Sequence, residues 1–179
     1  MKTYQECLAE YGSEYRVRKM LADGELHRTA HGLYSTELYE RLSAIAAVRY
    51  PNAVVSHDSA FFYHGLTDVY PDKLHLTVAR DSVKIHNAGI KQHFVAAKLL
   101  EIGKTEIEYN GEKIRTYDLE RLCIDLMRMR RKLPYDYYKE IVLSLRGRTH
   151  EMYPAKIDEY LDAFPHRSFI MSKIEKEIF

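Results

Sequence analysis

The apolar positions before residue 36 predict two short helices followed by a hairpin. The first helix, over residues 3–11, has apolar side chains three or four positions apart: Tyr4, Cys7, Leu8 and Tyr11. Gly12 breaks this helix, and the hydroxyl of Ser13 is suited to cap the next one. That second helix ends at Gly24, and its apolar side consists of Val17, Met20 and Leu21. Residues 26–34 have the pattern of two short strands.

Beyond residue 36 the pattern alternates between helices and strands. Helices are expected over 37–49, after the caps Ser56 and Asp118, around Tyr138 and after Pro154. Strands are expected over 53–55, 74–78 and 90–95, and on both sides of Asn110-Gly111. The Asn-Gly pair favours a two-residue hairpin turn because both residues tolerate a positive φ.

The order of these elements predicts an α+β fold with two domains. A helix, a tight turn, a basic helix and a hairpin follow one another in a winged helix-turn-helix. We therefore expect residues 1–35 to form a small domain of this kind that binds DNA. Residues 36–179 are expected to form a mixed α/β C-terminal domain that ends in helices.

Composition narrows the class of protein without indicating a function. Hydrophobic residues make up 46% of the 179 residues, which is enough to build a core. The chain has 27 Lys and Arg against 26 Asp and Glu, and a net charge of +1 excludes a uniformly basic DNA-coating protein. The longest apolar run, residues 44–48, is too short to span a membrane, and no signal peptide is recognisable. The only cysteines, Cys7 and Cys123, fit a reducing cytoplasm.

The second predicted helix and the hairpin carry the donors that DNA recognition requires. Base edges and phosphates present mostly acceptors, so a recognition helix needs donors on its outer face. The candidate DNA-binding residues are Ser13, Tyr15, Arg16, Arg18 and Lys19 on the helix, and Arg28, Thr29 and His31 on the hairpin. The alternative is that this short basic helix is only a solvated surface.

A second basic stretch, residues 121–148, contains eight Lys and Arg against three Asp and Glu. If the helix after Asp118 buries its leucines, its basic residues share the opposite face. The candidate basic patch consists of Arg121, Arg128, Arg131, Lys132, Lys139 and Arg146. It is interpreted as an electrostatic patch for a polyanion such as DNA, and the alternative is a set of scattered charges that keep the protein soluble.

The sequence contains a pattern that matches one enzymatic hypothesis. Nucleotidyltransferases need Gly-Ser followed by two carboxylates on a strand that bind magnesium, and Gly12-Ser13 precedes Asp23 and Glu25. That pair flanks the helix-ending Gly24, however, so we expect no catalytic residue. The histidines show no spacing typical of metal ligands, and neither a metal nor a cofactor is expected. A protein-interaction domain without DNA binding remains a further alternative.

Three blocks within residues 3–146 resemble a known family. They read LADGELHRTAHGLY, SHDSAFFYHGLTD and RTYDLERLCIDLMRMRRKLPYDYYKEIVLSLR, in this order. Together they are similar to the AbiEi family, the antitoxins of bacterial abortive-infection systems that are classed as type IV toxin–antitoxin systems and act in phage resistance.

The resemblance implies a transcriptional regulator with an N-terminal winged helix-turn-helix that binds inverted repeats in its own promoter. It also implies a C-terminal domain that counteracts a nucleotidyltransferase toxin, without requiring a stable complex with it, and the candidate basic patch is then a surface for antitoxicity or for further DNA contact. Carried over by position, the recognition helix is 13–22 and the wing is 26–34. Family members usually have another helix before the block that matches Thr3. We therefore expect a head of two helices that leans on the body or on another chain.

Overall fold

The two N-terminal helices begin and end where their capping chemistry places them. Thr3 and Glu6 form a reciprocal capping box at the start of α1 (Tyr4–Tyr11). Gly12 ends α1 with a φ of 81°, a left-handed conformation that glycine adopts without strain. The Ser13 hydroxyl accepts the backbone N–H of Arg16 and caps α2 (Glu14–Ala22), as its position in the sequence predicts.

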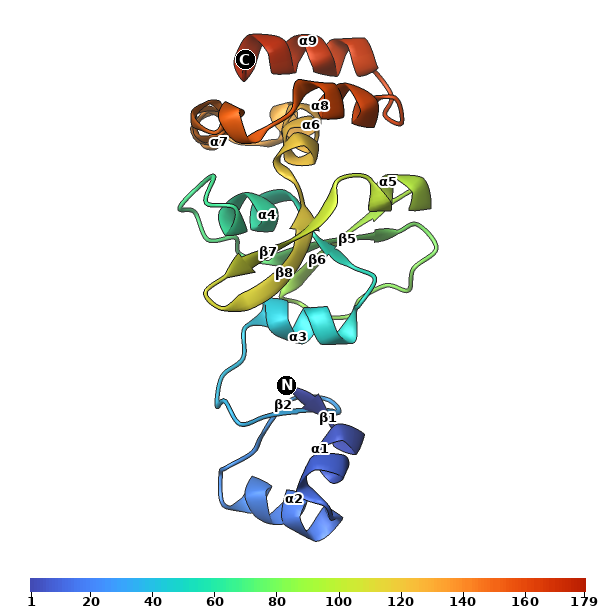
Figure 1. Cartoon of the computed structure of the whole chain (residues 1–179), viewed down its shortest axis with the longest axis vertical. Helices are drawn as coiled ribbons and strands as arrows, with labels where there is room; N and C mark the ends of the chain where they lie inside the picture. The colour runs from blue at the N-terminus through green and yellow to red at the C-terminus, as the bar shows by residue number, and fades with distance from the viewer. The chain divides into compact units, whose positions relative to one another are not determined.

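A three-stranded antiparallel sheet accompanies these helices, in the order β1-β3-β2 (Figure 1). The hairpin of β2 (His27–Ala30) and β3 (Leu33–Ser35) follows the predicted pattern. The pairing of β1 (Lys2–Thr3) with β3 was not foreseen, because a two-residue strand has no readable periodicity. A small core of Cys7, Val17 and Leu26 joins the helices to the hairpin.

The chain divides into two compact units, Met1–Pro51 and Asn52–Phe179, and the computed structural model describes all residues from 1 to 179. The sequence interpretation placed the division at residue 35, whereas α3 (Leu42–Arg49) groups with the first unit. The prediction of a helix from residue 37 was wrong at its start. The Ser35 hydroxyl binds the Glu37 amide and the Glu40 carboxylate, which holds the intervening backbone outside a helix.

The second unit contains two small sheets. In the first, β4 (Val54–Val55) pairs antiparallel with β5 (Leu74–Ala79), and β5 pairs parallel with β6 (Ile90–Val95). The second sheet is the hairpin of β7 (Lys104–Tyr109) and β8 (Glu112–Tyr117). Its turn has positive φ at both central residues, Asn110 (51°) and Gly111 (80°), as the Asn-Gly signal predicts.

Helices complete the second unit, and its core lies among them. They are α4 (His57–Tyr63), α5 (Ala97–Glu101), α6 (Leu119–Met129), α7 (Tyr135–Gly147), α8 (Pro154–Leu161) and α9 (Arg167–Glu177), with short 3₁₀ turns η1 (Arg130–Lys132) and η2 (Thr149–Glu151). The three C-terminal helices α7, α8 and α9 pack around α6 (Figure 1). The whole is an α+β fold. None of its helices has the length and apolar character needed to cross a membrane.

Candidate functional site

The outer face of α2 carries the cationic side chains that the sequence singles out. Val17 is fully buried in the core of the first unit, and Arg16, Arg18 and Lys19 on either side of it are exposed. Arg18 donates to the Glu14 carboxylate at 2.5 Å, so part of its charge is compensated within the helix. Arg16 and Lys19 form no ion pair. Because they are three positions apart, they lie on one side of α2 as two available cations.

The start of α2 is exposed as well. Tyr15 is 76% exposed, so its ring and hydroxyl are open to a partner. Ser13 is exposed, but its hydroxyl already accepts the Arg16 amide at 3.3 Å. We therefore assign Ser13 a positioning role, since the cap fixes the end of the helix that carries Tyr15 and Arg16.

The hairpin presents two of its three predicted residues. Arg28 and His31 are exposed, and the Arg28 guanidinium lies 3.2 Å from Nδ1 of His31, so the two side chains meet across the hairpin tip. Thr29 is partly buried, and its hydroxyl donates to the Leu33 carbonyl at 3.3 Å. A bulge between Arg28 and Ala30 sets the directions of these side chains. Thr29 therefore shapes the hairpin, whereas Arg28 and His31 remain accessible.

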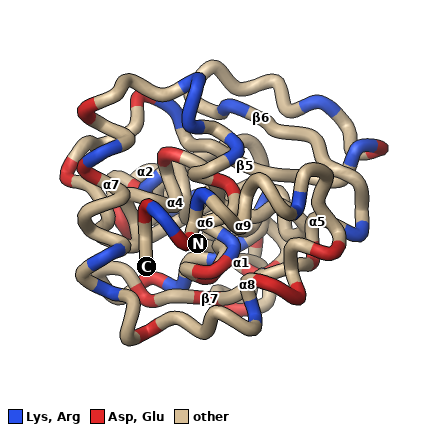
Figure 2. Tube along the Cα trace, turned by 90° about the horizontal axis from the view of Figure 1, so that it is seen from above, with Lys and Arg blue, Asp and Glu red and all other residues tan.

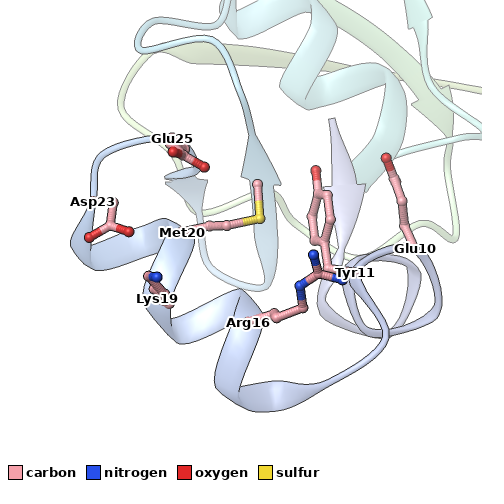
Figure 3. A pocket seen from close by; sticks show the side chains of 7 residues that line it. All are labelled: Glu10, Tyr11, Arg16, Lys19, Met20, Asp23 and Glu25. Atoms are coloured by element: carbon pink, nitrogen blue, oxygen red, sulfur yellow. The ribbon is translucent and has the colours of Figure 1, made fainter.

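A hollow of about 570 Å³ opens beside α2 (Figure 3). It is lined by Glu10, Tyr11, Arg16, Lys19, Met20, Asp23 and Glu25. Glu10, Tyr11 and Met20 are not recognisable as lining residues from the sequence, because they belong to predicted helices and have no separate chemical signal. The wall is mixed in charge, with two cations on α2 and three carboxylates around them.

Asp23 and Glu25, the carboxylates of the nucleotidyltransferase hypothesis, line this hollow but belong to a turn. Asp23 is the C-cap residue of α2, and Glu25 follows Gly24, whose φ is 72°. Both line the hollow, whereas the nucleotidyltransferase pattern requires the pair to lie within a strand. The pair is thus placed by the helix-ending turn and not by a sheet.

The candidate basic patch of the second unit is not one surface. Arg121 is 1% exposed, which corrects its placement on a solvent face. Its Nε donates to Asp125 at 3.1 Å, and its Nη1 donates to the carbonyls of Leu99 and Ile102. Its guanidinium also lies over the rings of Tyr117 and Phe164. The prediction failed because both sides of α6 are buried, so the polar stripe of the helix faces protein and not water.

The other five residues of the candidate patch are exposed but differ in their partners. Arg128 donates to Asp125 at 3.0 Å, and the Nε of Arg146 donates to the Glu177 carbonyl at 2.7 Å. Arg131, Lys132 and Lys139 form no ion pair. Acidic residues are interleaved with basic ones along the trace (Figure 2). The accessible part of the stretch is therefore reduced to these three residues.

Comparisons with known proteins add no assignment. No protein-family model and no curated protein matches this chain.

Proposed function

We propose that the N-terminal unit is a winged helix-turn-helix that binds duplex DNA, with α2 in the major groove and the β2–β3 hairpin as the wing. The observation that carries this proposal is the pair of exposed, unpaired cations on one side of a capped helix, Arg16 and Lys19. Arginine and lysine donors match phosphate oxygens and guanine edges. The adjacent Arg28 and His31 supply donors at the hairpin tip.

The first turn of α2 supports the placement of this helix in the major groove. Recognition helices contact base edges through their N-terminal residues, and exposed Tyr15 and Arg16 occupy this part of α2. The free amides of the first turn add a positive dipole end that favours phosphate. The acidic members of the hollow, Glu10, Asp23 and Glu25, repel phosphate, so they disfavour a DNA backbone inside the hollow itself.

We extend the proposal with the resemblance to the AbiEi family. The chain then acts as an antitoxin and autorepressor of a type IV system, binding inverted repeats in its promoter and counteracting a nucleotidyltransferase toxin. The exposed residues Arg131, Lys132 and Lys139 are the members of the basic stretch available for that second task. The turn placement of Asp23 and Glu25 favours this function over a nucleotidyltransferase activity of the chain itself.

The DNA-binding proposal is tested by fluorescence anisotropy with the full chain and duplexes from its own upstream region. The R16A/K19A variant should bind at least tenfold more weakly than the parent, since it loses two charge-assisted contacts. The R18A variant should lose less, because Arg18 is already paired with Glu14. The control is K113A, a charge loss at an exposed lysine of β8 in the second unit. Equal affinities for the parent and R16A/K19A would contradict the proposal.

The antitoxin part is tested by co-expression with the neighbouring toxin. Replacing Asp23 and Glu25 together by alanine should leave neutralisation intact, since the proposal assigns them no catalysis. Reversing Arg131 and Lys132 to glutamate should impair it. Loss of neutralisation in a folded, DNA-binding D23A/E25A variant would instead favour the enzyme reading.

A further inference from the structure

Three histidine rings from three elements meet in the second unit. His57 begins α4, His75 is on β5, and His93 is on β6. The rings of His57 and His93 stack with centroids 3.8 Å apart, and the His75 ring lies 5.1 Å from His93 and 6.1 Å from His57. The parallel register of β5 and β6 places Thr77 opposite His93. The cluster is thus assembled by the sheet and cannot be read from sequence spacing.

Two buried ring nitrogens in this cluster have no hydrogen-bond partner, Nδ1 of His75 and Nε2 of His93. His75 is only 5% exposed, and its Nδ1 lies 3.4 Å from the Asp58 carboxylate without the geometry of a hydrogen bond. Buried polar atoms are almost always satisfied by protein, water or a bound ion. Two unpartnered nitrogens in adjacent rings are therefore open to a water molecule or a bound ion.

The backbone and the hydroxyls around His57 hold its ring in this position. His57 has a φ of 52°, which is unusual for a residue other than glycine and is typical of functional sites. Its Nδ1 lies 2.9 Å from the Ser56 hydroxyl, which accepts a hydrogen bond from Thr77 at 2.7 Å. Ser56 therefore orients the histidine instead of capping α4, a correction to the sequence prediction.

The charges around the cluster favour an anion. After burial, which is the largest cause, nearby cations also lower the pKa of these rings: Lys91 and Lys132 that of His93, Lys91 that of His75, and Arg128 that of His57. Asp125 acts in the opposite direction, but it is already paired with Arg121 and Arg128. Asp58, the other carboxylate, accepts a hydrogen bond from Tyr137. Cations thus outnumber carboxylates even while the rings are neutral.

We propose that His57, His75 and His93 form a binding site for the phosphate group of a small molecule, with Lys91 and Lys132 at its rim. The proposal is independent of DNA binding by the first unit. A compact tetrahedral oxyanion offers acceptors to both orphaned nitrogens once these carry protons. A duplex backbone is too bulky for a cluster that includes the buried His75. A metal ion fits less well, since no group of His, Cys, Asp or Glu side chains is arranged to hold one.

Binding should be coupled to protonation. Burial, the strongest cause, lowers the pKa of each of these histidines from 6.5 to about 4, so the empty site is neutral at pH 7. A bound anion favours the charged rings and draws protons onto them. Affinity for phosphate should therefore rise by up to about tenfold for each pH unit below 7 per proton taken up.

The test uses the full chain and NMR of the histidine ring nitrogens, titrated at pH 7.5 and pH 6 with inorganic phosphate, adenosine 5′-monophosphate and a short duplex. We expect the His75 and His93 nitrogens to shift with phosphate, more strongly at pH 6. A nucleotide that binds at least tenfold more tightly than phosphate would identify a phosphomonoester as the ligand. The converse would identify free phosphate. A response to the duplex alone would overturn the proposal.

Two variants separate binding from folding. H93Q should weaken phosphate binding at least tenfold, whereas H86Q, at an exposed histidine outside the cluster, should not. Because H93Q alters a packed site, K91A provides a second test at an exposed side chain and should weaken binding several-fold. If phosphate does not shift the histidine ring-nitrogen signals, or shifts them equally in all variants, the proposal is overturned. The unpartnered nitrogens would then be satisfied by ordered water alone. Stoichiometric Zn²⁺ binding that H93Q abolishes, without a phosphate response, would also overturn it.

Discussion

Acidification should destabilise the second unit well before its carboxylates titrate, because it buries four neutral histidines. They are His57, His64, His75 and His93, and burial lowers the pKa of each to about 4. His64 is outside the three-ring cluster, and its Nε2 lies 2.8 Å from the Tyr117 carbonyl. An unfolded chain protonates these rings near pH 6.5, so it binds more protons than the folded chain between pH 6.5 and pH 4. The second unit therefore has its full unfolding free energy above pH 6.5, where the rings are neutral in both states. This free energy decreases as the pH falls from 6.5 to 4.

The size of the effect follows from the shifts. A change from 6.5 to about 4 corresponds to about 3 kcal/mol for each histidine. Three of the four side chains keep some solvent contact, which reduces the figure to about 1–2 kcal/mol each. With about 3 kcal/mol for the buried His75, the four together should remove about 6–9 kcal/mol of unfolding free energy between pH 7 and pH 4, as much as the whole stability of many domains.

Urea denaturation of the full chain at half-unit steps from pH 7.5 to pH 4.5, in phosphate-free buffer, measures this dependence. H64Q is the matched variant, because it removes one titrating ring outside the cluster. Its unfolding free energy should fall less steeply as the pH decreases, because the variant takes up about three protons on unfolding in this range and the parent takes up about four. An unfolding free energy that stays constant between pH 7 and pH 5 would refute the argument.

Two further predictions concern α6 and its surroundings. R121M should cost about 3–5 kcal/mol of unfolding free energy, because it leaves the buried Asp125 carboxylate without its main partner, whereas R128A should cost about 1 kcal/mol or less. Equal losses in urea denaturation would contradict this ranking. G103A should cost about 2–5 kcal/mol, since Gly103 has a φ of 72° and an added Cβ would lie 2.5 Å from the Arg121 Cβ. G111A, at a φ of 80° with open space around it, should cost about 1 kcal/mol in the same assay, and a larger loss for G111A than for G103A would exclude the clash.

Local signals in the sequence predicted the elements that depend on neighbouring residues. Ser13 and Asp118 cap the helices they were expected to cap, and the Asn110-Gly111 turn has the predicted backbone. These features depend on side-chain-to-backbone bonds within three or four residues, so a short window contains their cause. Helix α9 was missed because its apolar positions form a weak stripe, with only Ile170 and Ile174 buried.

Features that depend on tertiary packing could not be predicted in the same way. Arg121 has the position of a solvent-facing residue on an amphipathic helix, yet it is buried by Tyr117 at the end of β8 and by Phe164, and it donates to the carbonyls of Leu99 and Ile102. The three-histidine cluster depends on the parallel pairing of β5 and β6, which brings together residues eighteen positions apart, His75 and His93. The exposure of Arg16 and Lys19 was predictable, because the helix period and the buried Val17 determine it.

The central claim, that α2 binds DNA through its cations, is tested most directly by the salt dependence of binding. Each phosphate contact contributes about 0.9 to the slope of log K against log salt concentration. The slope for R16A/R18A/K19A should be shallower than the parent's by about 2, since Arg18 is already partly compensated by Glu14. K113A should keep the parental slope. A parental slope in the triple variant would contradict the placement of DNA on α2.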